Sequence, residues 1–250
     1  MTNYSQITFQ RNAVEPVACL KAGYELIKDQ YWLFLGMTIV GLLIGSMVPL
    51  GILLGPMMCG LYLSYFKRRR GEPVEFGLLF KGFDYFGPSV VASILHIVPI
   101  MAIIIPAYFL FYIGFFVTMV ASQGNEPNPG ASIIFALLIV LMYVVVILLV
   151  IIISIGFMFA YPLIVDRGLP GFEAVKLSFR AALSNFWRLL GLSLLSALLG
   201  MVGILLCIVG VYLVMPISYA ALAMAYEQVF GLANPGDVQT NLPPPPPNFT

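Results

Sequence analysis

The sequence predicts an all-α polytopic membrane protein with six transmembrane helices in three hairpins, each hairpin preceded by an amphipathic interfacial helix. Three observations predict this fold: long uncharged runs, the confinement of charge to the segments between them, and an internal parallel repeat. Of the 250 residues 61% are hydrophobic and 9% are charged, whereas about 25% are charged in a typical soluble domain. We expect a cytoplasmic segment over 1–14, a membrane domain over 15–230 and a Pro-rich cytoplasmic tail over 231–250.

The uncharged runs set the number of spans, because a helix needs about 20 apolar residues to cross a bilayer. The first and last runs, of 37 and 38 residues, are each long enough for two short spans joined by a turn. Each of the two middle runs supplies one long span. The four runs are Gln30–Phe66, Tyr85–Asn125, Pro127–Val165 and Leu189–Tyr226.

The positive charges give the orientation. With six spans both termini lie on one side of the membrane, and the loops on that side hold all 12 Lys and Arg residues. An excess of Lys and Arg marks the cytoplasmic loops of membrane proteins. We therefore expect both termini to be cytoplasmic.

An internal duplication relates the first and last hairpins. At an offset of 155 residues, Val17–Met47 aligns with Phe172–Val202 without a gap, and Trp32 aligns with Trp187, the only other tryptophan. After a five-residue insertion Pro56 aligns with Pro216. The copies cover 17–66 and 172–226, and two spans separate them. Because two is an even number, the copies point the same way and form a parallel repeat.

Each copy begins with a stretch of helical period that is too charged to insert into the membrane. Apolar residues recur at intervals of three and four, with charged residues on another face of the helix. A fainter version of this pattern precedes the middle hairpin, which covers 87–165. Such helices lie in the plane of the interface, where they either anchor the hairpins or form a docking platform for a partner or anionic lipid. The three apolar series are Val17, Leu20, Tyr24, Ile27 and Tyr31; Phe172, Val175, Phe179, Ala182 and Phe186; and Phe76, Leu79, Phe83 and Phe86.

The middle hairpin is longer than a bilayer is thick. Gly87–Val120 and Ser132–Val165 would each extend about 51 Å as straight helix, against a hydrocarbon core of about 30 Å. The aromatic residues between Tyr108 and Phe116 resemble an interfacial belt, so we expect the tip, including Gly124–Gly130, to stand outside the membrane. Pro99 and Pro106 are expected kinks.

Chemically active residues are sparse in the apolar runs. His96 is a candidate intramembrane polar site, either uncharged and hydrogen-bonded within a helix pair or part of a ligand site. Lys67, Arg68, Arg69 and Arg70 follow the second span, where they set the topology or contact lipid headgroups. The chain lacks HExxH, Walker A and GxSxG motifs and any Cys pair with metal-binding spacing. We expect no catalytic residues, cofactor or metal.

The chain end changes character. Pro243–Pro247 is a run of five prolines, which favours an extended polyproline conformation. Membrane phospholipids are the expected partners, together with membrane-protein subunits that contact the interfacial helices or this tail. Nucleic acid is not an expected partner.

Two groups of motifs carry a family resemblance over roughly residues 15–230. They are Gly55-Pro56 with Gly60, the basic run with Gly71 and Phe76 with Phe80-x-Gly82-Phe83, and later Asp166-x-Gly168, Ala174-x-x-x-Ser178 and Asn185-x-Trp187. With these motifs the chain resembles an uncharacterised bacterial family of multi-pass inner-membrane proteins, and is similar to the membrane domain attached to some glycerophosphodiester phosphodiesterases. The resemblance implies a bacterial cytoplasmic-membrane location; the phosphodiesterase catalytic domain has no counterpart here, so no activity is implied.

These observations together favour a non-enzymatic accessory, assembly or scaffold component that acts through protein and lipid contacts. The alternative is a transporter or lipid-handling protein whose pathway lies between the repeated hairpins. A transport path would show inward-facing polar groups at mid-depth, where the sequence offers His96 and hydroxyl groups.

Overall fold

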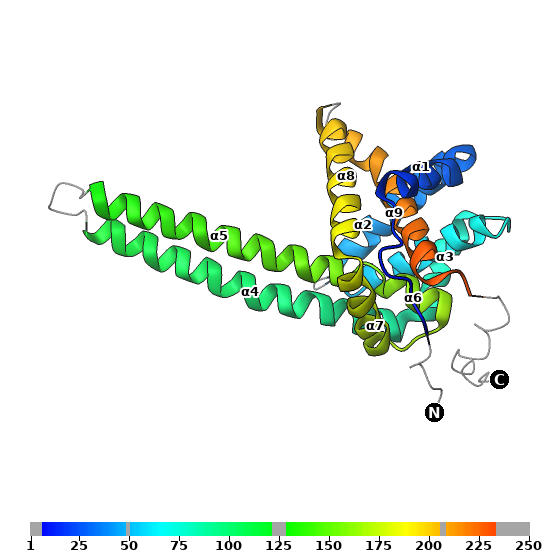
Figure 1. The fold of residues 1–250 in the computed structure, drawn as a ribbon, viewed down its shortest axis with the longest axis horizontal. Coiled ribbons are helices and arrows are strands. Elements are labelled where there is room, and N and C mark those ends of the chain that lie inside the picture. The colour runs from blue at the N-terminus through cyan, green and yellow to red at the C-terminus, as the bar shows by residue number, and fades with distance from the viewer. Residues whose placement is uncertain (1–6, 49–50, 122–128, 206–208, 234–250) are drawn as a thin grey trace. The chain divides into compact units, whose positions relative to one another are not determined.

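The computed structural model describes residues 7–48, 51–121, 129–205 and 209–233. Within these residues all regular structure is helical, as predicted (Figure 1). Five helical stretches are long and apolar enough to cross a membrane, which confirms a helical chain with several potential spans. They are Pro16–Met47, Phe76–Val120, Ile133–Arg167, Phe186–Leu205 and Gly210–Phe230.

The remaining predicted span, the second along the chain, corresponds to α3 (Leu54–Arg69). This helix has only 16 residues and is therefore not among these five. Its residues from Gly55 to Tyr62 are all buried inside the protein. At 1.5 Å per residue α3 is about 24 Å long, somewhat less than a hydrocarbon core. A total of six spans stays a prediction.

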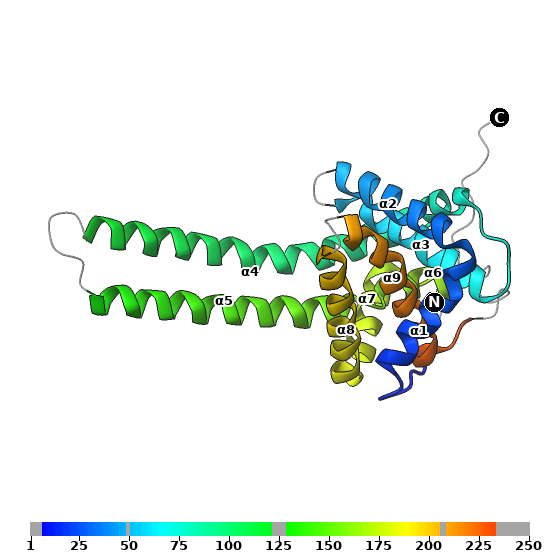
Figure 2. The same ribbon diagram turned by 90° about the horizontal axis from the view of Figure 1, so that it is seen from above.

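The chain divides into two compact units. Leu95–Ser154 forms one, and Met1–Ile94 with Ile155–Thr250 forms the other. The smaller unit holds most of α4 (Phe86–Ala121) and α5 (Pro129–Phe157), two helices that lie side by side in both views (Figures 1 and 2).

Most large apolar side chains of the smaller unit are exposed, as expected of helices in contact with lipid. Pro99 and Pro106 both lie inside α4, which continues past them. The predicted tip falls mostly on residues 122–128, and most of the Pro-rich tail on 234–250; both segments lie outside the described residues.

In the larger unit α3 lies at the centre. It packs on α2 (Tyr31–Met47), η4 (Phe76–Tyr85), α6 (Ala160–Arg167) and α9 (Val209–Phe230). Its aromatic residues contact those of its neighbours: Phe34 lies parallel to Tyr65 with ring centroids 4.9 Å apart, and the ring centroids of Phe66 and Tyr226 are 5.3 Å apart. The other helices of this unit are α1 (Pro16–Ile27), η2 (Lys28–Gln30), α7 (Gly171–Ser184) and α8 (Phe186–Leu205).

Glycines let the backbones of α3 and η4 touch. A Cβ atom on Gly60 would overlap the Leu79 carbonyl, and one on Gly82 would overlap the Pro56 carbonyl and lie 2.5 Å from the Gly60 nitrogen. Only glycine fits at such a crossing. The third predicted interfacial segment forms the 3-10 helix η4, and these glycines let it pack directly on α3.

Corresponding elements of the two aligned segments begin 155 residues apart: α1 and α7 at Pro16 and Gly171, and α2 and α8 at Tyr31 and Phe186. The residue that breaks each helix has nearly the same backbone conformation, φ −123° and ψ 29° at Gln30 and φ −117° and ψ 18° at Asn185. The following aromatic pairs, Tyr31–Trp32 and Phe186–Trp187, are both edge-to-face with an interplanar angle of 79°.

The side chains buried in α1 and α7 correspond as well. Val17 and Tyr24, which belong to the apolar series of α1, are exposed and do not lie on the side that packs against the protein. Phe172 of the series in α7 is exposed as well. The protein-facing side is made mostly of small residues, which allow close packing. The corresponding buried pairs are Cys19 and Ala174, Gly23 and Ser178, and Ile27 and Ala182.

Gly60→Ala should lower the free energy of unfolding by about 1–3 kcal/mol, because the added methyl group forces α3 away from η4. The matched control is Gly200→Ala in α8, where an added Cβ would meet no atom within 4 Å. We expect the control to keep or slightly raise stability, since alanine is the better helix former. Thermal unfolding of the detergent-solubilised protein measures both variants, and equal melting temperatures would contradict the close crossing.

Candidate functional site

The helices α3, α6 and α9 each end at a glycine with a positive φ. Gly71, Gly168 and Gly231 have φ values of 76°, 62° and 65°, the left-handed conformation that ends many helices. The residues just before and after these glycines form a polar cluster that involves all three helix ends.

Asp166 lies at the centre of this cluster, and its carboxylate is completely buried. Arg70 Nη2 donates to Asp166 Oδ1 over 2.9 Å, and the Tyr226 hydroxyl donates to Oδ2 over 2.8 Å. The Ala233 backbone N–H lies 3.2 and 3.1 Å from the two oxygens. Together with Arg167, these residues form what we call the Asp166 cluster.

Arg167 completes the cluster from the next position in α6. Its Nε lies 3.3 Å from Asp166 Oδ2, and its Nη2 donates to the carbonyls of Phe230 and Gly231 over 3.0 Å each. Cationic donors are favourable at the C-terminus of a helix, where carbonyl groups lack partners. The cluster therefore joins the ends of α3, α6 and α9 and holds the backbone that follows α9.

All four cations of the Lys67–Arg70 run are paired with carboxylates. Arg68 pairs with Asp29 at 3.0 Å, and Arg69 pairs with Glu227 at 2.7 Å. The hydrogen bond to Glu227 raises the pKa of the Arg69 guanidinium. Lys67 pairs with Glu72 at 3.3 Å, and Arg70 with Asp166 at 2.9 Å. These pairs connect α3 to η2, α9 and α6, a role distinct from the predicted headgroup contact, which stays a prediction.

His96 lies in α4 and belongs to the smaller unit, where it is partly buried. The Lys67–Arg70 run belongs to the larger unit, so the two sequence-predicted sites lie in different units. Among the described residues, no group of three or more His, Cys, Asp and Glu side chains could hold a metal ion.

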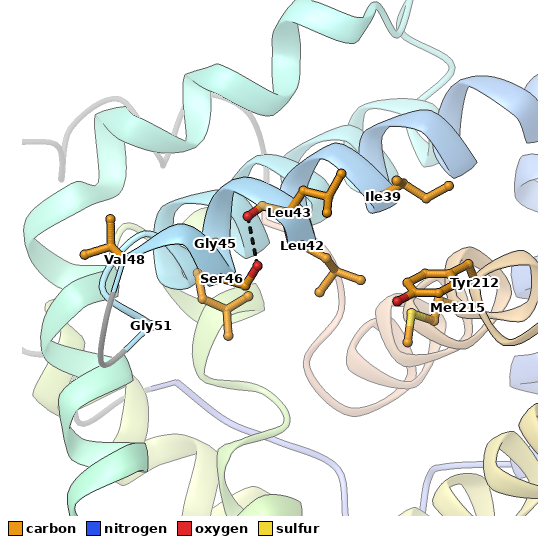
Figure 3. Close-up of a pocket in the computed structure, with 10 residues that line it drawn as sticks. Ile39, Leu42, Leu43, Gly45, Ser46, Val48, Gly51, Tyr212 and Met215 are labelled. Carbon is orange, nitrogen blue, oxygen red and sulfur yellow. Dashed lines mark hydrogen bonds between the residues drawn. The ribbon is translucent and has the colours of Figure 1, made fainter. Parts of the chain in front are cut away.

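An apolar groove of about 720 Å³ lies between α2 and α9 (Figure 3). It opens to the surface, and none of the described residues that line it is charged. Ser46 lies in the groove, but its hydroxyl donates to the Leu43 carbonyl over 2.9 Å and stays within α2. The lining residues are Ile39, Leu42, Leu43, Gly45, Ser46, Val48, Gly51, Leu54, Tyr212 and Met215.

The groove lies at the uncharged end of the helices. Leu54, which lines it, and Arg68, which pairs with Asp29, are 14 residues apart in α3, so they are separated by about 21 Å along the helix axis. The paired charges and the apolar groove therefore occupy opposite ends of α3.

Comparison of the chain with protein-family models, with curated proteins and with solved structures finds no match. The resemblance to the bacterial inner-membrane family stays a prediction.

Sequence reasoning identified neither the Asp166 cluster nor the groove. A usable signal for the cluster was present: Asp166 is the first carboxylate after the 39-residue uncharged run Pro127–Val165, and a cation and a glycine follow it directly. The groove has no comparable signal, because its walls come from segments about 160 residues apart.

Asp166→Asn should destabilise the protein by about 3–5 kcal/mol, since it leaves Arg70 and Arg167 without their buried counter-charge. The control is Asp29→Asn, because the Asp29 side chain is 66% exposed and an exposed ion pair contributes about 0–1 kcal/mol. Thermal unfolding in detergent compares the two. Similar losses in both variants would show that the cluster does not hold the three helix ends.

Proposed function

We propose that the protein is a multi-pass membrane protein that acts as an accessory, assembly or scaffold component through contacts with lipid and with other membrane proteins. Within this proposal, the groove holds a phospholipid acyl chain. The observation that carries this proposal is the groove between α2 and α9. An open apolar groove at hydrocarbon depth is filled by lipid tails, because water there would lose its hydrogen bonds. The lack of charge in the lining selects the tail of a lipid over its headgroup.

The architecture behind this proposal is six spans in three hairpins, with the first and last hairpins related by duplication. The equal 155-residue offsets, the matching conformations of Gln30 and Asn185 and the matching aromatic pairs support the duplication. The exposed apolar residues Val17 and Phe172 support an interfacial position for α1 and α7.

The proposed location is the bacterial cytoplasmic membrane, with both termini in the cytoplasm. Its support is the charge distribution: the ion pairs that Arg68 and Arg69 form with Asp29 and Glu227 cluster at one end of the helices, and positive charge is retained on the cytoplasmic side.

A lipid-handling or transport role is the second candidate, favoured by one observation. The groove is lined by α2 from the proposed first hairpin and by Tyr212 and Met215 of α9 from the proposed last one, and a transporter or lipid-handling protein of this kind would have its pathway between those two hairpins.

A phospholipid with a photoreactive diazirine near the end of its acyl chain should label the groove in reconstituted vesicles. We expect the label on α2 and α9 near Leu42 and Met215, and Ser46→Phe should reduce it severalfold by filling the groove. The control is Leu198→Phe, on the exposed surface of α8. Mass spectrometry of the labelled peptides gives the distribution, and equal labelling of all exposed helices would rule out a defined acyl-chain site.

The same vesicles distinguish the two candidate functions. With a fluorescent phospholipid in both leaflets, an impermeant reductant bleaches the outer leaflet alone unless the protein moves lipid between leaflets. A scaffold role predicts bleaching of half of the signal. Full bleaching that Ser46→Phe abolishes would favour the lipid-handling role.

Topology is tested with single cysteines in a chain whose three native cysteines are replaced by alanine. In intact cells, a cysteine at Glu75 should be protected from an impermeant thiol reagent, and one at Asn128 should be labelled. Permeabilised cells should show labelling at both positions. The reverse pattern in intact cells would overturn the orientation.

A further inference from the structure

The exposed face of α7 combines apolar and cationic side chains. Phe172, Lys176, Arg180 and Leu183 are all exposed. At 100° per residue their positions fall within a sector of about 80° around the helix. Trp187 follows at the start of α8 and is 79% exposed. Exposed apolar side chains that adjoin polar ones are typical of an interaction surface.

The cations of this face differ from those of the Lys67–Arg70 run. Within the described part of the chain, Lys176 and Arg180 have no carboxylate within ion-pair distance, whereas all four residues of the run have one. Glu173 lies in the first turn of α7 and is only partly exposed. Both charges of the α7 face therefore remain available to an anion outside the protein.

The corresponding face of α1 provides an internal comparison. Lys21 takes the position of Lys176, but Glu25 takes the position of Arg180 and pairs with Lys28. Both faces carry exposed apolar residues, and Trp32 is exposed like Trp187. The two faces thus share their apolar character and differ in charge.

We propose that the exposed face of α7 binds the headgroups of anionic phospholipids at the cytoplasmic surface of the membrane. Phe172, Leu183 and Trp187 enter the interfacial region, where aromatic residues are favoured. Lys176 and Arg180 lie beside them, in position to contact headgroup phosphates. This inference rests on the proposed membrane location; a protein partner with an acidic surface is the competing occupant, and the exposed apolar side chains before and after the cations along the chain favour lipid.

The test uses the two tryptophans of the full-length protein in vesicles. Trp32→Phe leaves Trp187 as the only tryptophan, and Trp187→Phe leaves Trp32. Each protein is reconstituted with a minor fraction of brominated phosphatidylglycerol or of brominated phosphatidylcholine, whose bromine atoms quench nearby tryptophan fluorescence. We expect Trp187 to be quenched severalfold more by the anionic lipid, and Trp32 equally by both.

The double substitution Lys176→Gln and Arg180→Gln, made in the protein that retains Trp187, should equalise the two lipids. Raising the salt concentration should have the same effect, because salt screens exposed charges. Thermal unfolding checks that this variant is folded, and Lys21→Gln is the matched control, which should leave the selectivity at Trp187 unchanged.

Three outcomes would overturn the inference: equal quenching of Trp187 by both lipids, selectivity that survives the double substitution, or quenching of Trp32 with none of Trp187. The last indicates that a protein covers α7. A failure of both tryptophans to respond to either lipid would instead contradict the proposed position of the interfacial helices, and with it the membrane architecture on which the proposed function rests.

Discussion

The arrangement of the larger unit depends on one buried carboxylate. Asp166 accepts from Arg70, which directly follows α3, from Tyr226 of α9 and from the backbone of Ala233, and it lies at the end of α6. A buried charge is costly unless every side of it is hydrogen-bonded. The ends of α3, α6 and α9 must therefore converge on Asp166, and the three left-handed glycines that end these helices allow the backbone to turn away directly after this point.

The features that could be predicted from the sequence depend on properties of single segments, such as the length of an uncharged run. Uncharged length is such a property, because a bilayer requires about 20 apolar residues whatever the packing, and the described residues show five stretches of that kind. α3 is the exception: it has 16 residues, and 11 of them are buried by neighbouring helices. Hydropathy cannot distinguish a short span from a helix at the centre of a bundle.

The candidate sites could be predicted less well, because contacts between distant segments determine them. The basic run was interpreted from its position after a span, but its chemistry depends on carboxylates from elsewhere, such as Asp29 and Glu227. The groove depends on the space between α2 and α9. Only the tertiary structure shows which charges are paired and which apolar faces are covered.

In α1 and α7 packing constrains which residues occupy the buried positions, but not which occupy the exposed ones. Their buried positions hold mostly small residues, since bulk there would push the helix away from its neighbours: a Cβ on Gly23 would lie 2.5 Å from the backbone nitrogen of Ala221. Their exposed positions have no such constraint. There Glu25 forms an ion pair with Lys28, the first residue of η2, whereas α7 has Arg180 at the position that corresponds to Glu25. Helices with corresponding buried positions can thus differ in the charged side chains on their exposed faces.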